Sequence, residues 1–360
     1  MKSFILSVAF LFVLFFSSNS YSQSADTTDK IKQVENNLTG PVQVEGDKPY
    51  TIAGQMANYN IKGVSVAVIH NYKLEWAKGY GWADEALKIP VTTQTLFQAA
   101  SISKSLNSVG ILKLVQDKKI DLYADINTYL TTWQFPYDSL SKGKKISVVN
   151  LLSHTGGLTV HGFPGYERGK DTIPAIVQIL NGQKPANSPA IRSMYEPGLK
   201  SEYSGGGITI SQLIVMDVTH QAYNKYMNDN VLKPLGMTSS TYTQPPVDVK
   251  PQLLATAYYI DGKEVPGKYH IYPEEAAAGL WTNPTDLAKY IIETQLAYAG
   301  RSDKVLSQQT TQLRLTPYID KNAALGVFVD NADSTKYFEH SGANECLDVR
   351  IMAVWKMAMG

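Results

Sequence analysis

The chain has 360 residues, of which 44% are hydrophobic and 18% are charged. This composition is typical of a folded globular protein and excludes a disordered chain, a collagen and a coiled coil. The 33 lysines and arginines balance 32 aspartates and glutamates, so no basic excess exists to neutralise nucleic-acid phosphates. Cys346 is the only cysteine and cannot form an internal disulfide. No Cys/His cluster has the spacing of a zinc site, so we expect neither a metal nor another cofactor.

The N-terminus has the pattern of a secretory signal peptide. Lys2 precedes the apolar run 4–16, and Ser20-Tyr21-Ser22 offers small residues where a signal peptidase cuts. The run is too short to span a hydrocarbon core of about 30 Å, although an uncleaved anchor is the alternative. We therefore expect a signal peptide over residues 1–22 and a periplasmic or secreted mature protein. No later stretch is long and apolar enough to add a membrane span.

The first elements after this segment are a short helix or arm and a hairpin. Residues 24–36 are polar and begin a short helix or a flexible arm. Residues 64–82 read as two strands joined at Asn71-Tyr72. Residues 101–118 then predict a helix, because Ile102, Leu106 and Val109 recur on one side.

Helices fill the middle of the chain, and strands return near its end. Further helices are expected over 147–152, 174–180, 208–219, 223–232 and 285–297, and strands over 326–329 and 349–354. This order predicts an α/β (α+β) fold in which an antiparallel sheet combines N- and C-terminal segments and a large helical part is inserted. We expect one domain over 23–360, with its sheet part at about 43–100 and 320–360 and its helical part at about 101–319.

Chemistry is suggested first by Ser101-Ile102-Ser103-Lys104, which has the form S-x-x-K. Residues three apart on a helix share a face, so the Lys104 amine can reach the Ser101 hydroxyl. A neighbouring base activates a serine, and burial can lower a lysine pKa enough for it to be that base. The alternative is that Ser101 only caps the helix while Lys104 is solvated.

Two later segments can complete such a site. Tyr203 precedes three glycines and a helix, and a phenol aimed at Ser101 can pass its proton to a leaving group. His340-Ser341-Gly342-Ala343 follows a strand-like stretch, where Gly342 lets a substrate lie along the strand edge. The N–H groups of Ser101 and Ala343 would then hold an oxyanion. A packing tyrosine and a structural histidine are the plainer alternatives.

The ordered set of motifs resembles the serine β-lactamase and penicillin-binding-protein superfamily, in its class C-like branch. That branch includes class C β-lactamases, D-Ala-D-Ala carboxypeptidases, D-aminopeptidases and family VIII esterases. The resemblance spans about 63–344 and rests on segments 95–97, 101–104, 151–158, 196–205, 233–237, 278–281 and 340–342.

The resemblance implies a role for each matched residue. Ser101 is expected to be the acylated nucleophile, Lys104 its base partner and Tyr203 the tyrosine of the second motif. His340 stands where many members carry lysine, and with Ser341 and Gly342 it is expected to bind substrate. His154, in Leu151–Leu158, is expected to belong to a structural loop beside the site rather than to a Ser-His-Asp triad.

The chain departs from the family at the second and third motifs. Gly205 stands at the substrate-binding position of an asparagine that normally holds the substrate amide, and His340 removes a fixed positive charge. Both changes favour simple esters over β-lactams.

The C-terminal end is a further departure. Family members continue past the third motif through a turn, two strands and a long helix, whereas residues 346–354 supply one strand at best. We expect a truncated end, an open sheet edge and low stability or a tendency to associate.

We therefore expect an exported serine hydrolase that forms an acyl-enzyme on Ser101 and acts on a small ester, peptide or β-lactam. β-Lactamase or D-Ala-D-Ala carboxypeptidase activity on the same residues is one alternative, and a catalytically impaired penicillin-binding-like protein is another.

Overall fold

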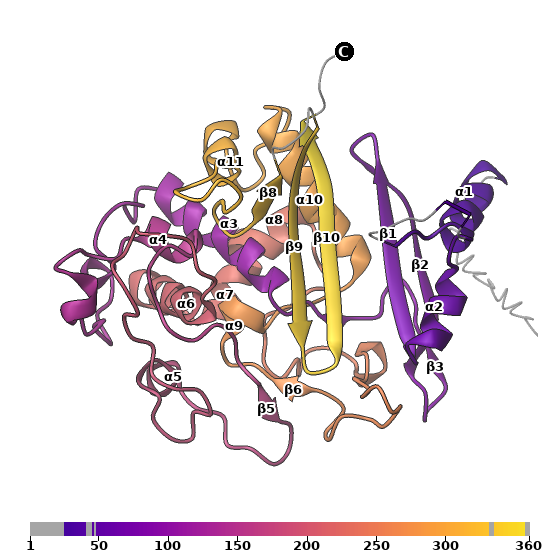
Figure 1. The fold of residues 1–360 in the computed structure, drawn as a ribbon, viewed down its shortest axis with the longest axis horizontal. Coiled ribbons are helices and arrows are strands. Elements are labelled where there is room, and N and C mark those ends of the chain that lie inside the picture. Colours follow the sequence, from indigo (N-terminus) through magenta and orange to yellow (C-terminus); the bar gives the residue numbers. More distant parts are fainter. Residues whose placement is uncertain (1–24, 41–44, 47, 331–334, 357–360) are drawn as a thin grey trace, which may run out of the picture. The chain divides into compact units, whose positions relative to one another are not determined.

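The computed structural model describes residues 25–40, 45–46, 48–330 and 335–356 (Figure 1). The predicted signal peptide lies outside these residues. The chain divides into two compact units, residues 1–52 and 53–360. In the first unit, α1 (Ala25–Asn36) confirms the short helix predicted there, and Leu38 and Tyr50 form a two-way backbone bridge with N–O distances of 2.9 and 2.8 Å. α2 (Ile52–Asn58) begins at the boundary. No helix in the described part is long and apolar enough to cross a membrane.

The longer strands of the second unit form two antiparallel sheets. The first has the order β1-β2-β3, with β1 (Gly63–His70), β2 (Lys73–Asp84) and β3 (Ile89–Pro90). The second has the order β10-β9-β8, with β8 (Phe328–Asp330), β9 (Lys336–Asn344) and β10 (Leu347–Lys356). The predicted hairpin and the predicted C-terminal strand are confirmed. Among the described residues, however, β1 and β10 do not pair, so the N- and C-terminal segments make two sheets rather than one.

Two short two-stranded sheets connect distant segments of the helical part. β4 (Phe97–Gln98) pairs with β7 (Trp281–Thr282), and β5 (Tyr166–Glu167) pairs with β6 (His270–Ile271). The β4–β7 pair matters for the site, because β4 leads directly into Ser101.

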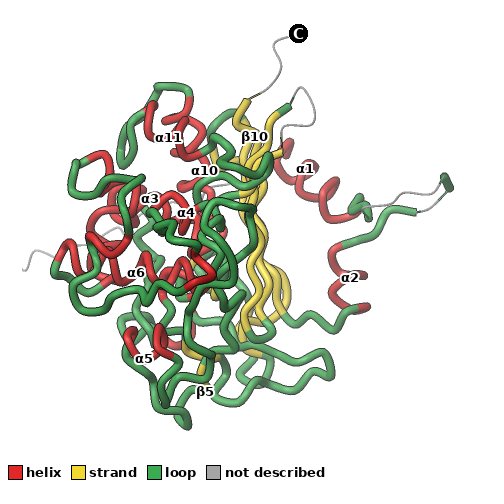
Figure 2. Tube along the Cα trace, turned by 60° about the vertical axis from the view of Figure 1, so that its left-hand side comes forward, coloured by secondary structure: helices red, strands yellow, loops and turns green. Residues whose placement is uncertain are grey.

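Helices occupy the middle of the chain, as predicted, and lie to one side of the strands (Figure 2). The α-helices of this part are α3 (Ile102–Gln116), α4 (Val148–Leu152), α5 (Ile176–Asn181), α6 (Gly205–Thr219), α7 (Tyr223–Met227), α8 (Lys233–Leu235), α9 (Glu275–Ala278), α10 (Pro284–Tyr298) and α11 (Gln308–Arg314). A π-helical segment, Asn228–Leu232, joins α7 to α8, and single 3₁₀ turns cover Ile126–Thr128, Ser139–Ser141 and Pro251–Leu253. The predicted mixed α/β fold class is confirmed.

The central helix α3 is buried on nearly all sides, whereas its sequence suggested one apolar face. Small polar residues occupy the remaining faces and find partners inside the core. Asn107 donates to the Ser211 hydroxyl at 2.9 Å and accepts from the Tyr223 hydroxyl at 3.0 Å. Because buried polar groups cost little once they are hydrogen-bonded, α3 can pass through the core and still carry Ser101 at its start.

Candidate active site

Ser101 and Lys104 meet at the N-terminus of α3. The Lys104 amine donates to the Ser101 hydroxyl oxygen at 2.8 Å and to the Ala277 carbonyl at 2.7 Å. Ser101 is the N-cap residue, but its side chain makes no capping hydrogen bond. The hydroxyl is thus aimed at the amine rather than at the helix backbone. This is the arrangement that the S-x-x-K motif predicted. The alternative, in which Ser101 only caps the helix and Lys104 is solvated, is wrong.

Burial gives Lys104 an unusual protonation balance. Its side chain is 2% exposed, and this loss of solvation lowers the pKa of Lys104 from 10.5 to about 7. A large fraction of the amines is therefore neutral at neutral pH and can accept a proton. The Ala277 carbonyl on α9 orients the amine without supplying a negative charge that would keep it protonated. No sequence signal pointed to this carbonyl, because backbone atoms leave no mark in residue type.

The backbone just before Ser101 is strained. Ala100 has a φ of +46°, a region that residues with a side chain rarely adopt. Such conformations cost of the order of 1–3 kcal/mol and persist where the surrounding structure enforces them. Here, the backbone N–H of Ala99 donates to the carbonyl of Leu280 at 2.7 Å on one side, and Ile102 and Ser103 begin α3 on the other. The left-handed conformation of Ala100 turns the chain sharply from β4 into α3, so that Ser101 lies at the bend.

Tyr203 stands over the pair on a loop that leads into α6. The Lys104 amine lies 5.0 Å from the centroid of the Tyr203 ring. Burial raises the pKa of Tyr203, and a side-chain hydrogen bond with Ser101 opposes that shift. The phenol therefore keeps its proton at neutral pH while contacting the predicted nucleophile. The structure brings together the three residues Ser101, Lys104 and Tyr203.

His154 fixes the loop that carries Tyr203. Its ring centroid lies 4.4 Å from that of Tyr203, and its Nδ1 accepts from the Ser204 backbone N–H at 3.3 Å. The His154 carbonyl accepts from the Glu202 N–H at 2.8 Å, so both neighbours of Tyr203 are held. Burial first, and then the charge of Lys104, lower the pKa of His154 well below 6.5. A neutral, packed imidazole fits the structural role that the sequence suggested.

β9 runs past the nucleophile and brings the third motif to the site. A Cβ atom on Gly342 would lie 2.5 Å from the Ala99 carbonyl oxygen and 2.8 Å from the Ser101 nitrogen. The strand can approach this closely only because residue 342 is glycine. The side chain of Ser341, next to it, is exposed.

The hydrogen-bond pattern of the β9–β10 hairpin indicates where the Ala343 N–H points. The Val354 carbonyl accepts from the Gln295 side chain at 2.6 Å, so Val354 faces away from β9. The register from Val354↔Tyr337 to Asp348↔Ala343 is unbroken, and residues alternate along it between bonded and non-bonded pairs. Ala343 is therefore a non-bonded partner of Asp348, and its N–H points to the other side of β9. β8 pairs only as far as Glu339, which leaves this side of Ala343 open.

His340 is buried and neutral. Its side chain is 2% exposed, its Nδ1 lies 2.5 Å from the Ser341 carbonyl, and its Nε2 has no hydrogen-bond partner in the described structure. Burial lowers the pKa of His340 to about 3, and the nearby charge of Lys104 adds to this. The third motif therefore offers an uncharged group 6.3 Å, centroid to centroid, from the Tyr203 ring.

Gly205 is packed rather than open to a substrate. A Cβ atom there would lie 2.9 Å from the His161 carbonyl oxygen and 3.2 Å from the Phe163 ring. Its N–H donates to the same carbonyl at 2.9 Å. The loop 161–163 thus fills the space beside residue 205, and substrate binding by Gly205 stays a prediction. The position of this loop could not be inferred from the sequence.

Two acids at the start of α9, the buried Glu274 and the partly buried Glu275, were also not singled out from the sequence. Burial raises the pKa of both Glu274 and Glu275 to about 8, so both are largely protonated at neutral pH. Neither carboxyl oxygen of Glu274 has a hydrogen-bond partner among the described residues. They stand at the start of the helix whose Ala277 carbonyl holds Lys104, inside an otherwise apolar run. No group of three or more His, Cys, Asp or Glu in the described ranges could hold a metal ion.

The chain belongs to the beta-lactamase family, whose sequence profile matches residues 50–349. It is therefore a member of the serine β-lactamase and penicillin-binding-protein superfamily. Protein flp of Staphylococcus aureus strain N315 is 28% identical over 207 residues, which is 58% of this chain and 40% of that protein. The putative penicillin-binding protein PbpX of Bacillus subtilis strain 168 is 23% identical over 292 residues, which is 79% of this chain and 66% of PbpX.

Solved structures share the fold at low sequence identity. The octameric penicillin-binding protein homologue from Pyrococcus abyssi superposes with a TM-score of 0.70 at 23% identity, over 85% of this chain and 70% of that one. FmtA from Staphylococcus aureus superposes with a TM-score of 0.62 at 20% identity, over 91% of this chain and 86% of that one.

Proposed function

We propose that this protein is an exported serine hydrolase that forms an acyl-enzyme on Ser101 and hydrolyses small esters or amides. The observation that carries the proposal is the 2.8 Å contact between the Ser101 hydroxyl and an amine whose pKa is about 7. Family membership supports the same chemistry. The resemblance of the motif residues to the class C-like branch supports assigning the chain to that branch as part of this proposal.

Each step can be assigned to a group of this chain. Neutral Lys104 takes the proton of the Ser101 hydroxyl, and the oxygen attacks the substrate carbonyl carbon. The backbone N–H groups of Ser101 and Ala343 hold the negative oxygen that develops. Gly342 brings β9 close to the backbone nitrogen of Ser101, and the Ala343 N–H points to the side of β9 that β8 leaves open. Tyr203 gives its proton to the leaving group, and the Lys104 ammonium returns a proton to the phenol. Water then attacks the ester on Ser101, with the same groups acting in reverse order.

Esters are the favoured substrates over β-lactams. The neutral His340 supplies no fixed positive charge for a substrate carboxylate, which β-lactams and C-terminal peptides carry. No asparagine side chain projects from position 205 to hold an amide. We expect the specificity constant for p-nitrophenyl acetate to exceed that for nitrocefin. Faster turnover of nitrocefin would reject the ester preference in favour of a β-lactamase or a D-Ala-D-Ala carboxypeptidase.

Covalent labelling separates an enzyme from a catalytically impaired binding protein. A fluorescent fluorophosphonate should label the protein, and a fluorescent penicillin should label it more slowly. Ser101→Ala should abolish both signals, whereas Ser103→Ala, one position from Lys104 but hydrogen-bonded to the Ala100 carbonyl, should retain labelling by the same reagent. Labelling that persists in Ser101→Ala would place the nucleophile elsewhere.

Export is tested independently. The mature protein recovered outside the cytoplasm should begin at Gln23 on N-terminal sequencing. Retention of residues 1–22 on a membrane-bound product would favour the uncleaved anchor instead.

A further inference from the structure

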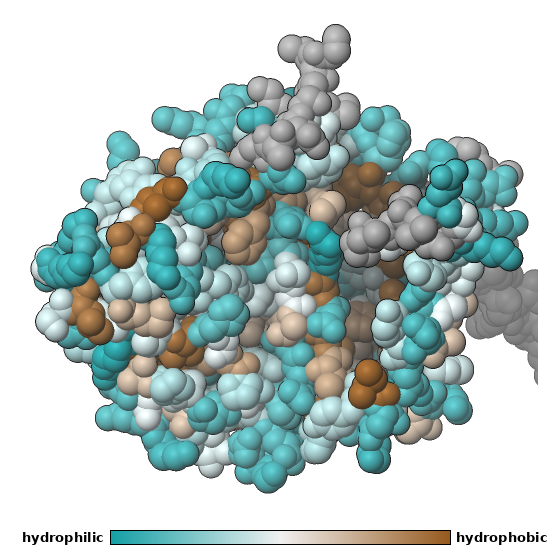
Figure 3. Space-filling model, in the orientation of Figure 1, coloured by the Kyte–Doolittle hydropathy of each residue, from teal (hydrophilic) through white to brown (hydrophobic). Residues whose placement is uncertain are grey.

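The carbonyl that holds Lys104 lies on a very short helix. Ala277 belongs to α9, which has four residues, and its carbonyl accepts from the Lys104 amine at 2.7 Å. The alanines of α9 are buried, and side chains of mixed polarity cover this part of the molecule on the face that Figure 3 shows. Isolated helices of fewer than about 12–15 residues are only marginally stable. The position of this carbonyl therefore depends on contacts that other parts of the chain make with α9.

Gln212 of α6 supplies such a contact at the N-terminal end of α9. Its side-chain oxygen accepts from the Ala276 backbone N–H at 2.9 Å, and its side-chain nitrogen donates to the Pro273 carbonyl at 3.0 Å. The first N–H groups of a helix have no partner within it, so the glutamine oxygen satisfies one of them. Gln212 is buried, and both ends of its amide are used in this contact.

The two bonds bracket the residue that shapes the turn. The Glu274 carbonyl accepts from the backbone N–H groups of Ala277 and Ala278, each at 2.9 Å. Gln212 holds the chain on both sides of Glu274. It therefore fixes the turn that aims the Ala277 carbonyl at Lys104.

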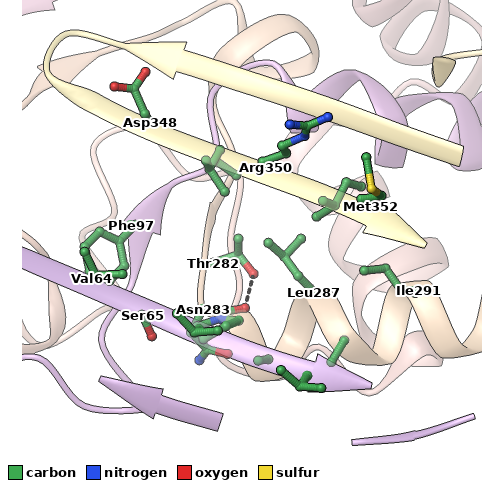
Figure 4. A pocket seen from close by; sticks show the side chains of 18 of the residues that line it. Val64, Ser65, Phe97, Thr282, Asn283, Leu287, Ile291, Asp348, Arg350 and Met352 are labelled. Atoms are coloured by element: carbon green, nitrogen blue, oxygen red, sulfur yellow. Dashed lines mark hydrogen bonds between the residues drawn. The ribbon is translucent and has the colours of Figure 1, made fainter. Parts of the chain in front are cut away.

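The C-terminal end of α9 is fixed by other contacts. The Ser103 hydroxyl accepts from the Leu280 backbone N–H at 3.0 Å. The chain then enters β7, where Thr282 is the partner of Phe97 on β4, and both residues line the cavity drawn in Figure 4. Because these contacts hold the C-terminal end, loss of the Gln212 bonds should loosen the N-terminal turn without detaching the whole segment.

The helix that carries Gln212 also fixes the loop of Tyr203. Ser204 is the N-cap residue of α6, and its hydroxyl accepts from the Gly207 N–H at 2.9 Å. Gln212 lies about two turns further along the same helix. One helix thus holds the tyrosine at its start and, through Gln212, the carbonyl that orients the lysine.

We propose that Gln212 is a positioning residue for the hydrolysis proposed above: by clamping α9, it keeps the Ala277 carbonyl on the Lys104 amine and the amine on the Ser101 hydroxyl. The inference rests on the proposed function, because it assigns Gln212 a part in that reaction. Gln212 itself touches neither the nucleophile nor the base, and it acts through the backbone of α9.

The other titratable groups that face Lys104 are neutral at neutral pH. Burial raises the pKa of Tyr203 and lowers the pKa values of His154 and His340. The two acids at the start of α9 are largely protonated for the same reason. Within the described residues, the amine is therefore held by its hydrogen bonds rather than by a charged partner.

Gln212→Met keeps the length of the side chain and removes both hydrogen bonds. A loosened α9 admits water to Lys104, so the pKa of this amine should rise from about 7 toward 10.5 by roughly one unit. An NMR titration of the lysine Cε signals, assigned with Lys104→Met, measures this in the full mature protein without substrate. The kcat for p-nitrophenyl acetate at pH 7 should fall roughly 10–100-fold with little change in KM.

A conservative variant tests whether the hydrogen bonds themselves matter. In Gln212→Glu, the protonated acid can donate to Pro273 and accept from Ala276, as the amide does. At pH 6 this variant should therefore keep most of the wild-type rate, whereas Gln212→Met should not. Equal losses in the two variants at pH 6 would contradict the proposed clamp.

Gln244→Met is the matched control. Gln244 bonds the same segment, to the Gly279 carbonyl at 2.5 Å and the Tyr272 N–H at 3.3 Å, but outside the turn that carries Ala277. It should lower Tm by an amount similar to Gln212→Met and leave the Lys104 titration in place. Equal shifts of that titration in both variants, or no shift in Gln212→Met, would overturn the inference. A wild-type protein that neither hydrolyses the ester nor is labelled on Ser101 would instead reject the proposed function.

Discussion

The imidazole of His154 packs against the ring of Tyr203 with the two ring planes tilted by 35°, and its Nδ1 accepts a hydrogen bond from the backbone N–H of Ser204, one residue beyond Tyr203. The phenol that contacts Ser101 is therefore held by a residue that does not itself reach the nucleophile. This makes His154 a positioning residue.

His154→Ala should reduce both stability and turnover. The Ser204 N–H would lose its acceptor inside the core, which costs about 1–3 kcal/mol. A displaced Tyr203 should lower kcat more than it raises KM. His161→Ala is the matched control, because His161 also packs on Tyr203, with 4.9 Å between ring centroids, but is exposed. Thermal unfolding and steady-state kinetics with p-nitrophenyl acetate check this, and equal effects of the two variants would contradict it.

Lys104 sets the pH dependence of the reaction. The neutral amine is the active form, so kcat/KM should rise with pH and level off above about pH 7. Lys104→Met should lower kcat by roughly 10²–10⁴-fold and remove this ionisation. Lys104→Arg should be equally slow, because a guanidinium keeps its proton. A pH profile that is unchanged in either variant would assign the base to another group.

The same lysine links stability to pH. Its pKa is about 7 when folded and 10.5 ordinarily, so the unfolded chain binds more protons between these values. The contribution of Lys104 to stability should therefore rise as the pH goes from about 7 to 10.5, whereas the raised pKa values of Glu274 and Glu275 act in the opposite direction up to about pH 8. Denaturant unfolding at several pH values measures the slope, and Lys104→Met should reduce it. A slope that is identical in the variant would mean that the amine is not depressed in the folded protein.

The loss of activity in Tyr203→Phe should depend on the leaving group of the substrate. The variant cannot pass a proton to the departing atom, so amide hydrolysis should fall by roughly 10²–10⁴-fold. Hydrolysis of p-nitrophenyl acetate should fall much less, because p-nitrophenolate leaves without a proton. Comparing p-nitrophenyl and p-nitroanilide substrates of the same acyl group checks this. Equal losses on both would assign Tyr203 a role before the leaving group departs.

Gly205→Asn should not restore β-lactam hydrolysis. A side chain at 205 meets the His161 carbonyl at 2.9 Å, so the loop 161–163 must shift. We expect a lower Tm and no gain in nitrocefin turnover. Gly162→Ala is the control for stability, because no atom lies within 4 Å of its added Cβ. A gain in nitrocefin turnover at unchanged Tm would show that the loop yields easily.

Residue spacing predicted much of the fold and the central pair of the site. Serine and lysine three positions apart on a helix share a face, and the apolar run 63–69, followed by a turn and the alternating run 73–82, favours a hairpin. These local rules predicted α3, the β1–β2 hairpin, the helices in the middle of the chain and the Ser101–Lys104 pair. The order of the motifs along the chain indicated the family.

Tertiary structure decided what local rules cannot reach. The contact of Lys104 with the Ala277 carbonyl, the packing of His154 on Tyr203 and the loop beside Gly205 join segments far apart in the chain. A sequence pattern does not record such contacts. The depressed pKa of Lys104 also depends on burial from every side, not on its neighbours along the helix. Tertiary packing likewise decides that β1 and β10 lie in separate sheets among the described residues.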